Sequence, residues 1–305
     1  MGGQRGRRPW PVGLPPGGSH DGGGGSGLPC AAVYKREIEV ATRLAREASR
    51  VVLEVYATDF DVAYKGANDP VTVADQRAND LIVRGLREAF PGDGVVAEES
   101  PDRSDALARG RCWYVDPLDG TKEFIAKNGE FAVMIGLSVE GEARAGVVHQ
   151  PVKDKLYRGV VGEGAVLEEG GQQRPLTVSE TADPAALRLV VSRSHRAAST
   201  DKLVERLGIR DELQHGSVGL KIGILSERGA DLYVIMAPKS SKWDACGPEA
   251  VLRAAGGRFS DLAGNPFVYR GPEMLNVGGI LACNAAAYDA VLPVAREVAR
   301  EIGLI

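Results

Sequence analysis

The residues with the clearest chemical potential lie in one short run, Trp113-Tyr-Val-Asp116-Pro-Leu-Asp119-Gly-Thr121-Lys-Glu-Phe124. Three apolar residues predict a strand that ends at Asp116, because the proline that follows disfavours helical backbone. Gly120 and Thr121 then open a predicted helical turn, whose free N–H groups can bind an anion. Two carboxylates beside an anion site repel a phosphate unless a divalent cation lies between them. Oxygen-only ligands favour Mg²⁺ or Mn²⁺ over zinc.

A surface turn is the alternative interpretation of this run alone, because Asp, Pro and Gly are common turn formers. Other acids at the ends of predicted elements argue against that alternative. They are Glu98-Glu99 after the apolar strand Val95–Ala97, Asp75 in the first turn of a helix, and Asp244 in Trp243-Asp244 before a helix that Gly256-Gly257 closes.

In their order, these segments resemble the lithium-sensitive, magnesium-dependent phosphomonoesterases, the family that includes inositol monophosphatase and 3'(2'),5'-bisphosphate nucleotidase. The family pattern is an Asp, then Glu-Glu, then Asp-Pro-Ile/Leu-Asp-Gly/Ser-Thr, then Trp-Asp, with a Gly-Gly pair one helix later. Every segment is present here in that order, from Asp75 to Gly256-Gly257. The resemblance extends from about Glu37 to the C-terminus.

The resemblance implies two or three Mg²⁺ ions, with Mn²⁺ as an alternative metal, in a carboxylate cluster that holds ions roughly 4 Å apart. The implied metal ligands are Glu98, Asp116, the Leu118 carbonyl, Asp119 and Asp244, with Asp116 shared by two ions. Thr121 and Asp75 match the pair that orients and deprotonates the attacking water. The backbone N–H groups of Gly120 and Thr121 would hold the phosphate oxygens. Each acid taken singly could instead be a solvated surface carboxylate, but their joint occurrence argues against this.

Substrate choice depends on finer features, because the same metal ligands serve inositol phosphates, sugar bisphosphates and nucleotides. The continuation Lys122-Glu123-Phe124 resembles the bisphosphate nucleotidase branch, whereas inositol monophosphatases usually have Thr-Asn-Phe. Ser192-Arg193-Ser194-His195 and Trp243-Asp-Ala-Cys-Gly-Pro-Glu249 resemble the same branch. The implied substrate contacts are Lys221, Ser217, Ser194 and His195, with Lys221 as a point charge near the phosphate that is not cleaved.

One departure favours the nucleotide branch. Inositol monophosphatases carry a Glu that contacts ring hydroxyls in the strand before Trp-Asp, and the corresponding stretch Tyr233-Val-Ile-Met236 has no acid. The sequence therefore predicts hydrolysis of the 3'-phosphate of adenosine 3',5'-bisphosphate to AMP and phosphate. An inositol mono- or polyphosphate phosphatase is the alternative. A catalytically silent protein that binds phosphate esters is a more distant one, against which the intact Asp75 and Thr121 argue.

The role of several residues allows more than one interpretation. Lys221 could be a helix-surface lysine, and His195 and His215 could be structural histidines. Arg193 could hold a helix end, and Glu99 could be either a helper through water or an exposed charge. The spacing from Ser217 to Lys221 is one residue longer than in some family members, which leaves the role of Ser217 open.

Composition excludes several classes of partner. The net charge of −4 gives no basic surface for polymeric nucleic acid. No segment approaches the roughly twenty apolar residues that a membrane span requires. The four cysteines, Cys30, Cys112, Cys246 and Cys283, lack CxxC spacing and are expected to be reduced, mostly buried thiols in a cytoplasmic protein. The expected partner is a small phosphate ester, and a homodimer is left open.

The chain divides into a tail and a phosphatase domain. Residues 1–33 are rich in Gly, Pro and Arg and are expected to form a disordered extension. Arg7-Arg8 does not predict twin-arginine export, because no apolar segment follows. Residues 34–305 form the predicted phosphatase domain, in which 34–180 bind metal and phosphate and 181–305 supply Asp244 and the substrate pocket.

Hydrophobic periodicity predicts a mixed α/β fold. The predicted helices span about 38–55, 74–86, 200–207, 219–228, 248–255 and 286–302. The predicted strands are 95–97, 113–115, 131–139, 143–150, a hairpin within 155–167, 187–192, 212–215, 231–236 and 279–284. The resemblance implies the layered α/β/α/β/α sandwich of the inositol monophosphatase and fructose-1,6-bisphosphatase type, which periodicity alone does not select.

Overall fold

The structure is a computed structural model that describes residues 33–305 except 67–68, 101–103, 108 and 195–196. The predicted N-terminal extension lies outside these residues apart from Val33, as does Cys30. Within the described part, no helix is long and apolar enough to cross a membrane.

A seven-stranded sheet forms the first β layer, with its strands in chain order. They are β3 (Gly94–Ala97), β4 (Arg111–Asp119), β5 (Ala132–Val139), β6 (Glu142–Gln150), β7 (Lys155–Val160), β8 (Gly164–Glu169) and β9 (Gln172–Leu176). The β3–β4 pair is parallel and the later pairs are antiparallel. Successive residues of β4 pack in different hydrophobic cores, Trp113 on one face of the sheet and Tyr114 on the other. Apolar packing therefore covers both faces.

Two long helices, α1 (Lys35–Tyr56) and α2 (Val73–Ala89), cover one face of this sheet. Their apolar stripes follow helical spacing and are buried, as Leu44, Ala48, Ile82 and Leu86 illustrate. Both helices confirm the predicted elements. The hairpin of β1 (Val62–Gly66) and β2 (Asp69–Thr72) joins them and was not predicted.

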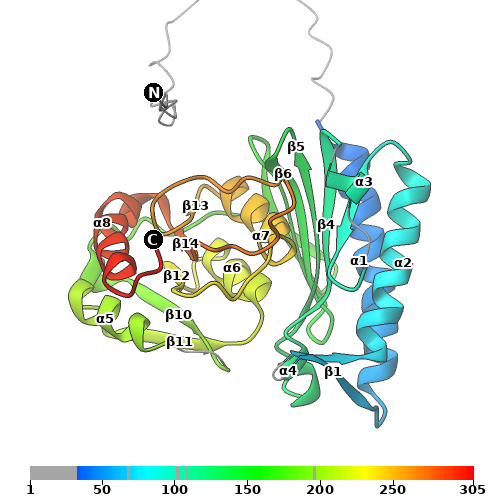
Figure 1. The fold of residues 1–305 in the computed structure, drawn as a ribbon, viewed down its shortest axis with the longest axis horizontal. Coiled ribbons are helices and arrows are strands. Elements are labelled where there is room, and N and C mark those ends of the chain that lie inside the picture. The colour runs from blue at the N-terminus through cyan, green and yellow to red at the C-terminus, as the bar shows by residue number, and fades with distance from the viewer. Residues whose placement is uncertain (1–32, 67–68, 101–103, 108, 195–196) are drawn as a thin grey trace, which may run out of the picture. The chain divides into compact units, whose positions relative to one another are not determined.

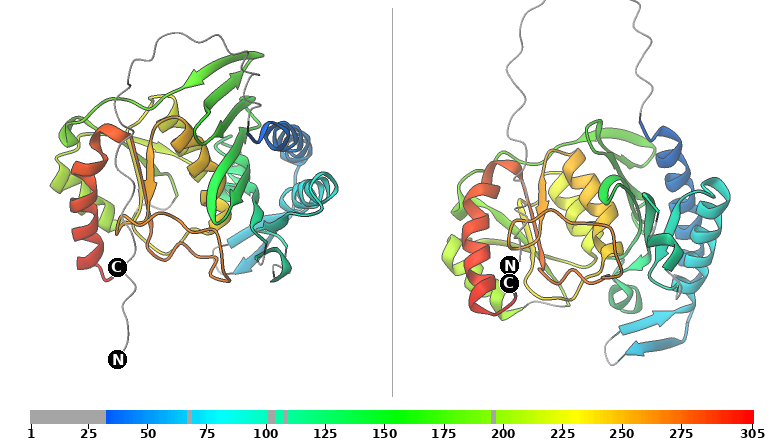
Figure 2. Two further views of the ribbon diagram at one scale, coloured as in Figure 1. Left: turned by 90° about the horizontal axis from the view of Figure 1, so that it is seen from above. Right: turned by 45° about the horizontal axis from the view of Figure 1, so that its top comes forward.

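A five-stranded sheet forms the second β layer, in the order β11-β10-β12-β14-β13. Its strands are β10 (Arg188–Ser192), β11 (Asp211–His215), β12 (Leu232–Ile235), β13 (Arg258–Ser260) and β14 (Ile280–Cys283). Helices α6 (Val218–Ser226) and α7 (Lys242–Ala254) lie between the two sheets, and α5 (Ala198–Leu207) and α8 (Ala285–Glu301) cover the outer face (Figures 1 and 2). This arrangement confirms the five-layered α/β/α/β/α sandwich.

Small residues allow α7 to approach the large sheet closely. A Cβ atom on Gly136 would lie 2.3 Å from the Gly247 nitrogen, and one on Gly146 would lie 2.1 Å from the Gly247 oxygen. Larger side chains at either position would push α7 away from the sheet. Because Asp244 lies in the first turn of α7, the same close contact positions its carboxylate.

The prediction for α7 was partly wrong, because the helix begins at Lys242 and not at Pro248. Proline is typical of a first helical turn, yet here it lies inside the helix. Pro248 has no N–H, so the Asp244 carbonyl four residues earlier lacks the usual helical hydrogen bond from this position. The helix α3 (Ser104–Leu107), the short helical turn η1 (Pro184–Ala186) and the edge strands β9 and β13 were also not predicted.

Candidate active site

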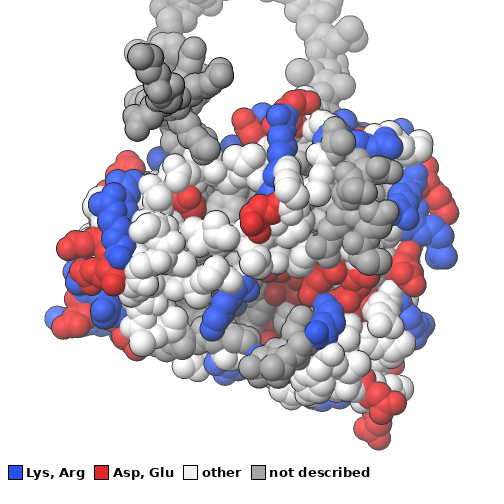
Figure 3. Space-filling model, viewed as in Figure 1, with Lys and Arg blue, Asp and Glu red and all other residues white. Residues whose placement is uncertain are grey.

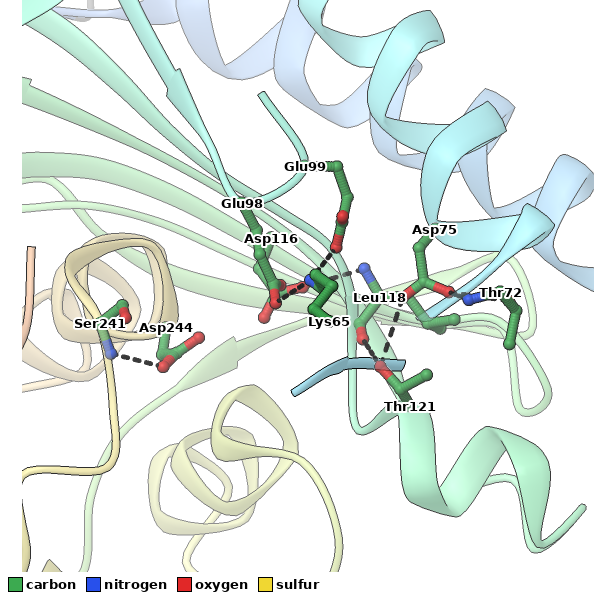
Figure 4. Close-up of polar contacts among 10 residues, drawn as sticks. All are labelled: Lys65, Thr72, Asp75, Glu98, Glu99, Asp116, Leu118, Thr121, Ser241 and Asp244. Carbon is green, nitrogen blue, oxygen red and sulfur yellow. Dashed lines mark hydrogen bonds and ion pairs between the residues drawn. The ribbon is translucent and has the colours of Figure 1, made fainter. Parts of the chain in front are cut away.

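Four of the predicted acids come from separate elements and lie around one region at the end of the large sheet, as Figure 4 shows for Asp75, Glu98, Asp116 and Asp244. In the parallel β3–β4 pair, Ala97 lies opposite Val115, and the Glu98 N–H donates to the Val115 carbonyl at 3.1 Å. Parallel strands end at the same edge of a sheet, so Glu98 lies beside Asp116.

A bulge in β4 separates its two acids. Asp116 pairs with Met134 of β5 and Asp119 with Ala132, so Pro117 and Leu118 together lie opposite the single residue Val133, and β4 has one extra residue. The Leu118 N–H donates to Asp116 Oδ1 at 2.9 Å. The strand therefore runs three residues beyond the end that the sequence predicts.

Gly120 then starts the short helix α4 (Thr121–Ile125), as predicted. Its φ of 96° lies in the left-handed region, and a Cβ atom would lie 3.0 Å from the Glu130 carbonyl oxygen. Glycine is the residue that tolerates both conditions. The tight turn brings Thr121 back towards the acids.

Two of the acids lie at helix starts and have the same local contact. Asp75 Oδ2 accepts hydrogen bonds from the Thr72 N–H and hydroxyl, both at 2.7 Å. Asp244 Oδ2 accepts one from the Ser241 N–H, also at 2.7 Å. Each acid is the third residue of its helix, so one oxygen helps to cap the helix while the other is directed elsewhere.

The Thr121 hydroxyl joins Asp75 to the β4 bulge. Thr121 Oγ1 lies 3.3 Å from Asp75 Oδ1 and 3.2 Å from the Leu118 carbonyl oxygen. A hydroxyl has one proton, so it donates to one of these acceptors at a time and its lone pairs can accept a further proton donor. The arrangement is suited to passing a proton towards Asp75.

Burial and mutual repulsion dominate the electrostatics. Burial raises the pKa of Asp116 well above its usual range, and Glu98, Asp119 and Asp244 raise it further. Burial likewise raises the pKa of Asp244, and it raises that of Asp75 to about 6 against the Thr72 hydrogen bonds. These carboxylates are stabilised in their ionised form only if positive charge is brought among them.

Lys65 of β1 contacts two of these acids and was not predicted from the sequence. Its ammonium donates to Glu98 Oε1 at 3.0 Å and also to Glu99 (Figure 4). Burial opposes protonation of Lys65, but the two glutamates raise its pKa above the ordinary value. Burial raises the pKa of Glu98 to about 7, and Lys65 opposes this rise.

The donor set fits Mg²⁺ in chemistry, since oxygen ligands and buried negative charge are what a hard cation requires. As the side chains stand, the described residues contain no group of three or more His, Cys, Asp or Glu that could hold a metal ion. Glu98 contacts Lys65, Asp119 contacts Ser217, and Asp244 contacts Ser241. Mg²⁺ commonly binds through one or two carboxylates plus water and phosphate, so it does not need such a cage.

The predicted substrate residue Lys221 lies on α6 beside Asp119. It is 2% exposed, its Nζ lies 5.1 Å from the centre of the Tyr233 ring, and it contacts the His215 carbonyl at 3.4 Å. Burial lowers its pKa to about 8, whereas Asp119, Glu123 and Glu130 raise it. Lys221 is therefore a buried cation and not a helix-surface lysine.

Ser217 caps α6 and connects it to β4. Its hydroxyl donates to Asp119 and accepts from the Leu220 N–H, and the Gly219 N–H donates to Asp119 at 2.8 Å. Its φ of 60° is unusual for a serine and costs about 1 kcal/mol or more. These contacts hold Asp119 and Ser217 together.

The remaining predicted residues lie where β10 and β11 end. The Ser194 hydroxyl donates to Glu123 at 2.6 Å. Arg193 binds Glu130 through two hydrogen bonds of 2.7 and 2.8 Å, and His215 Nδ1 lies 2.9 Å from the Gly216 carbonyl. His195 lies outside the described residues. Figure 3 shows acidic side chains gathered in a hollow of this face, with basic side chains at its margin.

Comparisons with known proteins identify the family of the chain. The sequence model of the inositol monophosphatase family matches residues 34–300. The chain is 37% identical over 245 residues to the 3'(2'),5'-bisphosphate nucleotidase CysQ of Escherichia coli (strain K12), which covers 79% of this chain and 97% of that protein. It is 28% identical over 275 residues to inositol monophosphatase 1 of Mus musculus, covering 85% and 96% of the two chains.

Solved structures show the same fold. The CysQ structure from Bacteroides thetaiotaomicron, a bacterial member of the inositol monophosphatase family, superimposes with a TM-score of 0.72 at 31% identity, covering 83% of this chain and 98% of that one. The extragenic suppressor protein suhB from Bartonella henselae gives 0.75 at 23% identity, with 86% and 99% covered.

Proposed function

Because the chain belongs to the inositol monophosphatase family, we propose that this phosphatase is a Mg²⁺-dependent phosphomonoesterase that hydrolyses the 3'-phosphate of adenosine 3',5'-bisphosphate. The products are AMP and phosphate. The observation that carries the reaction type is the Thr121 hydroxyl, which lies within hydrogen-bonding distance of Asp75 and the Leu118 carbonyl.

The proton of the attacking water leaves through Thr121 and Asp75. The threonine oxygen accepts a hydrogen bond from the water while its own proton points to Asp75 Oδ1. A pKa of about 6 leaves most of Asp75 ionised at neutral pH and still basic enough to take the proton. Thr72 fixes the other Asp75 oxygen, which keeps Oδ1 directed at Thr121.

The proposed metal ligands are Glu98, Asp116, the Leu118 carbonyl, Asp119 and Asp244. When bound there, Mg²⁺ would increase the acidity of the attacking water and neutralise the charge that develops on the leaving oxygen. The backbone N–H groups of Gly120 and Thr121 are proposed to hold the phosphate oxygens.

Lys221 supports a substrate with a second phosphate. An ammonium has three donors, and its contact with the His215 carbonyl at 3.4 Å is long, so Lys221 retains capacity for a phosphate oxygen. In the adjoining strand β12 and the residue after it, positions 233–236 provide no carboxylate for polyol hydroxyls. The identity to bisphosphate nucleotidases is also higher than to inositol monophosphatase 1.

The test is phosphate release from adenosine 3',5'-bisphosphate and from inositol 1-phosphate, measured side by side in Mg²⁺ and in EDTA. We expect a higher kcat/KM for the nucleotide and no turnover in EDTA. Preference for inositol 1-phosphate would transfer the assignment to the inositol phosphatase class. Binding of both esters without turnover would indicate a silent phosphate-ester-binding protein.

A further inference from the structure

Glu130 connects the end of the large sheet to the second sheet. It lies just before β5, and its carboxylate accepts hydrogen bonds from Arg193 Nε and Nη2 at 2.8 and 2.7 Å. The Gly216 N–H donates to the same carboxylate at 2.7 Å. Arg193 follows β10 and Gly216 follows β11, so one acid holds the ends of two neighbouring strands. Neither Glu130 nor Arg193 has a role in the proposed reaction.

The backbone around Glu130 is itself held in place. The buried Gln150 amide donates to the Gly129 carbonyl at 2.9 Å. A Cβ atom on Gly120 would lie 3.0 Å from the Glu130 carbonyl oxygen, and one on Gly216 would lie 2.7 Å from it. The Glu130 backbone is therefore in close contact with the turn proposed to bind phosphate and with the segment that leads into α6.

The contact between Glu130 and Arg193 fixes orientation more than it adds stability. Burial raises the pKa of Glu130, but the hydrogen bonds from Arg193 and Gly216 lower it further, so the pKa lies below its usual value. The Arg193 side chain is 42% exposed, and an ion pair of such exposure adds little to the free energy of unfolding. Two parallel hydrogen bonds from a planar guanidinium nevertheless define one relative position of the two groups.

The strand ends held in this way lead to Lys221 through one carbonyl group. The Arg193 N–H donates to the His215 carbonyl at 3.2 Å, and Lys221 Nζ lies 3.4 Å from the same oxygen. Arg193 Nη2 also contacts the Gln214 carbonyl at 3.3 Å. The position of the Lys221 ammonium therefore depends on the strand end that Glu130 and Arg193 hold.

We propose that Glu130 is a positioning residue that sets the preference for a substrate with two phosphates. By holding Arg193 and Gly216, its carboxylate fixes the His215 carbonyl and thereby the Lys221 ammonium. Glu130 acts on the binding of the uncleaved phosphate and leaves the chemical step at the other phosphate unaffected. This inference rests on the proposed function, because it takes Lys221 as the residue that binds the uncleaved phosphate.

The experiment compares adenosine 3',5'-bisphosphate with adenosine 3'-phosphate, which lacks the uncleaved phosphate. Glu130→Gln keeps the size of the side chain but removes the charge that holds Arg193. Its KM for the bisphosphate should rise by about three- to thirtyfold at nearly unchanged kcat, the range for one member of a hydrogen-bond network. Its KM for the monophosphate should stay at the wild-type value. Arg193→Gln should give the same pattern.

A double variant tests the route through Lys221. If Glu130 acts by placing the Lys221 ammonium, adding Glu130→Gln to Lys221→Met should raise the KM for the bisphosphate no further. A rise by the same factor with and without Lys221 would overturn the inference, because Glu130 would then act independently of the ammonium.

Glu301→Gln is the matched control, because Glu301 also accepts two hydrogen bonds from an arginine, Arg206, at 2.7 and 2.9 Å on the outer helices. This variant should leave both KM values unchanged. Equal losses on the two substrates in Glu130→Gln, or no loss on either, would overturn the inference. Wild-type protein that releases no phosphate from the bisphosphate would instead overturn the proposed function on which it depends.

Discussion

At the scale of single residues, the site is a set of acids whose charge is incompletely balanced by two lysines. Lys65 is shared by Glu98 and Glu99, and Lys221 lies near Asp119. Asp116 has neither lysine among the groups that shift its pKa most, and burial raises that pKa well above the usual range. Each acid therefore depends on a different neighbour, and single substitutions should separate their roles.

Thr121→Ala tests the proton path. The variant loses the hydroxyl that links the attacking water to Asp75 but keeps the backbone N–H. Its kcat should fall by roughly a hundredfold with little change in KM, as expected for an interaction made mainly in the transition state. Steady-state kinetics would check this, with Thr121→Ser as the control that retains the hydroxyl. A raised KM at unchanged kcat would show that Thr121 binds substrate instead.

Lys221→Met tests the contact with the uncleaved phosphate. The KM for adenosine 3',5'-bisphosphate should rise by about ten- to a hundredfold, the range for a hydrogen bond to a charged group. Hydrolysis of an ester with one phosphate should change far less. Comparing the two substrates in one preparation removes any general effect of the lost buried charge. Equal losses on both would mean that Lys221 supports the fold alone.

The sequence indicated these acids because their types and spacing follow a known pattern, but it gave no signal for Lys65. Its partners Glu98 and Glu99 lie 33 and 34 residues further along the chain, and they meet it only after the hairpin forms. Glu123 and Glu130 were not assigned to the site for the same reason. Contacts of this kind depend on tertiary structure, so no periodic pattern in the sequence predicts them.

At the scale of elements, the start of α2 combines stability with chemistry. The Thr72 hydroxyl accepts from the Ala74 N–H at 3.2 Å and donates to Asp75. Thr72→Ala should lower the free energy of unfolding by about 1 kcal/mol, the usual cost of a lost helix cap. It should also lower kcat, because Asp75 loses one of the groups that orient it. Urea unfolding and kinetics would measure both effects, and Thr72→Ser should restore both.

Helix α7 carries a buried acid whose titration opposes folding. Burial raises the pKa of Glu249 from 4.5 to about 7, although Arg253 at 3.0 Å and the Tyr269 hydroxyl at 2.6 Å oppose the rise. Between these two pKa values the folded protein keeps a proton that the unfolded chain has released. The contribution of Glu249 to stability is therefore present below pH 4.5 and is lost as the pH rises towards 7.

Glu249→Gln should accordingly flatten the pH dependence of unfolding. Relative to wild type, the loss of unfolding free energy between pH 5 and pH 8 should be smaller by about 1–3 kcal/mol. Urea unfolding at the two pH values would measure it. Glu297→Gln, at an exposed position of α8, should keep the wild-type dependence. An unaltered slope in Glu249→Gln would contradict the raised pKa.

Long helices and the strands of both sheets were predictable because their apolar patterns repeat over many residues. The β1–β2 hairpin, β9 and β13 were not, because their residues form no continuous apolar run, in contrast to the short strands β3 and β14. The start of α7 was misplaced because Pro248 has the local signature of a first turn, whereas close packing against Gly136 and Gly146 keeps the helix continuous through it.

At the scale of the whole described domain, metal binding and folding should be linked. The acids come from β4, α2, α7 and the residue that follows β3, so their repulsion acts between layers of the sandwich. Asp116→Asn removes one of these charges and should raise the unfolding temperature in EDTA while abolishing turnover. Wild-type protein should gain more stability from Mg²⁺ than the variant. Scanning calorimetry with and without Mg²⁺ would decide, and full activity in the variant would refute the proposed role of Asp116.

The helix starts at Thr72 and Ser241 affect which residues are retained as the sequence evolves. Asp75 and Asp244 each give one oxygen to the backbone of their own helix, so natural selection for a stable protein preserves them even without selection for turnover. A descendant that lost the reaction would discard Glu98 or Thr121 sooner than either of these aspartates. Among homologues, Glu98 and Thr121 are therefore the better markers of a working enzyme.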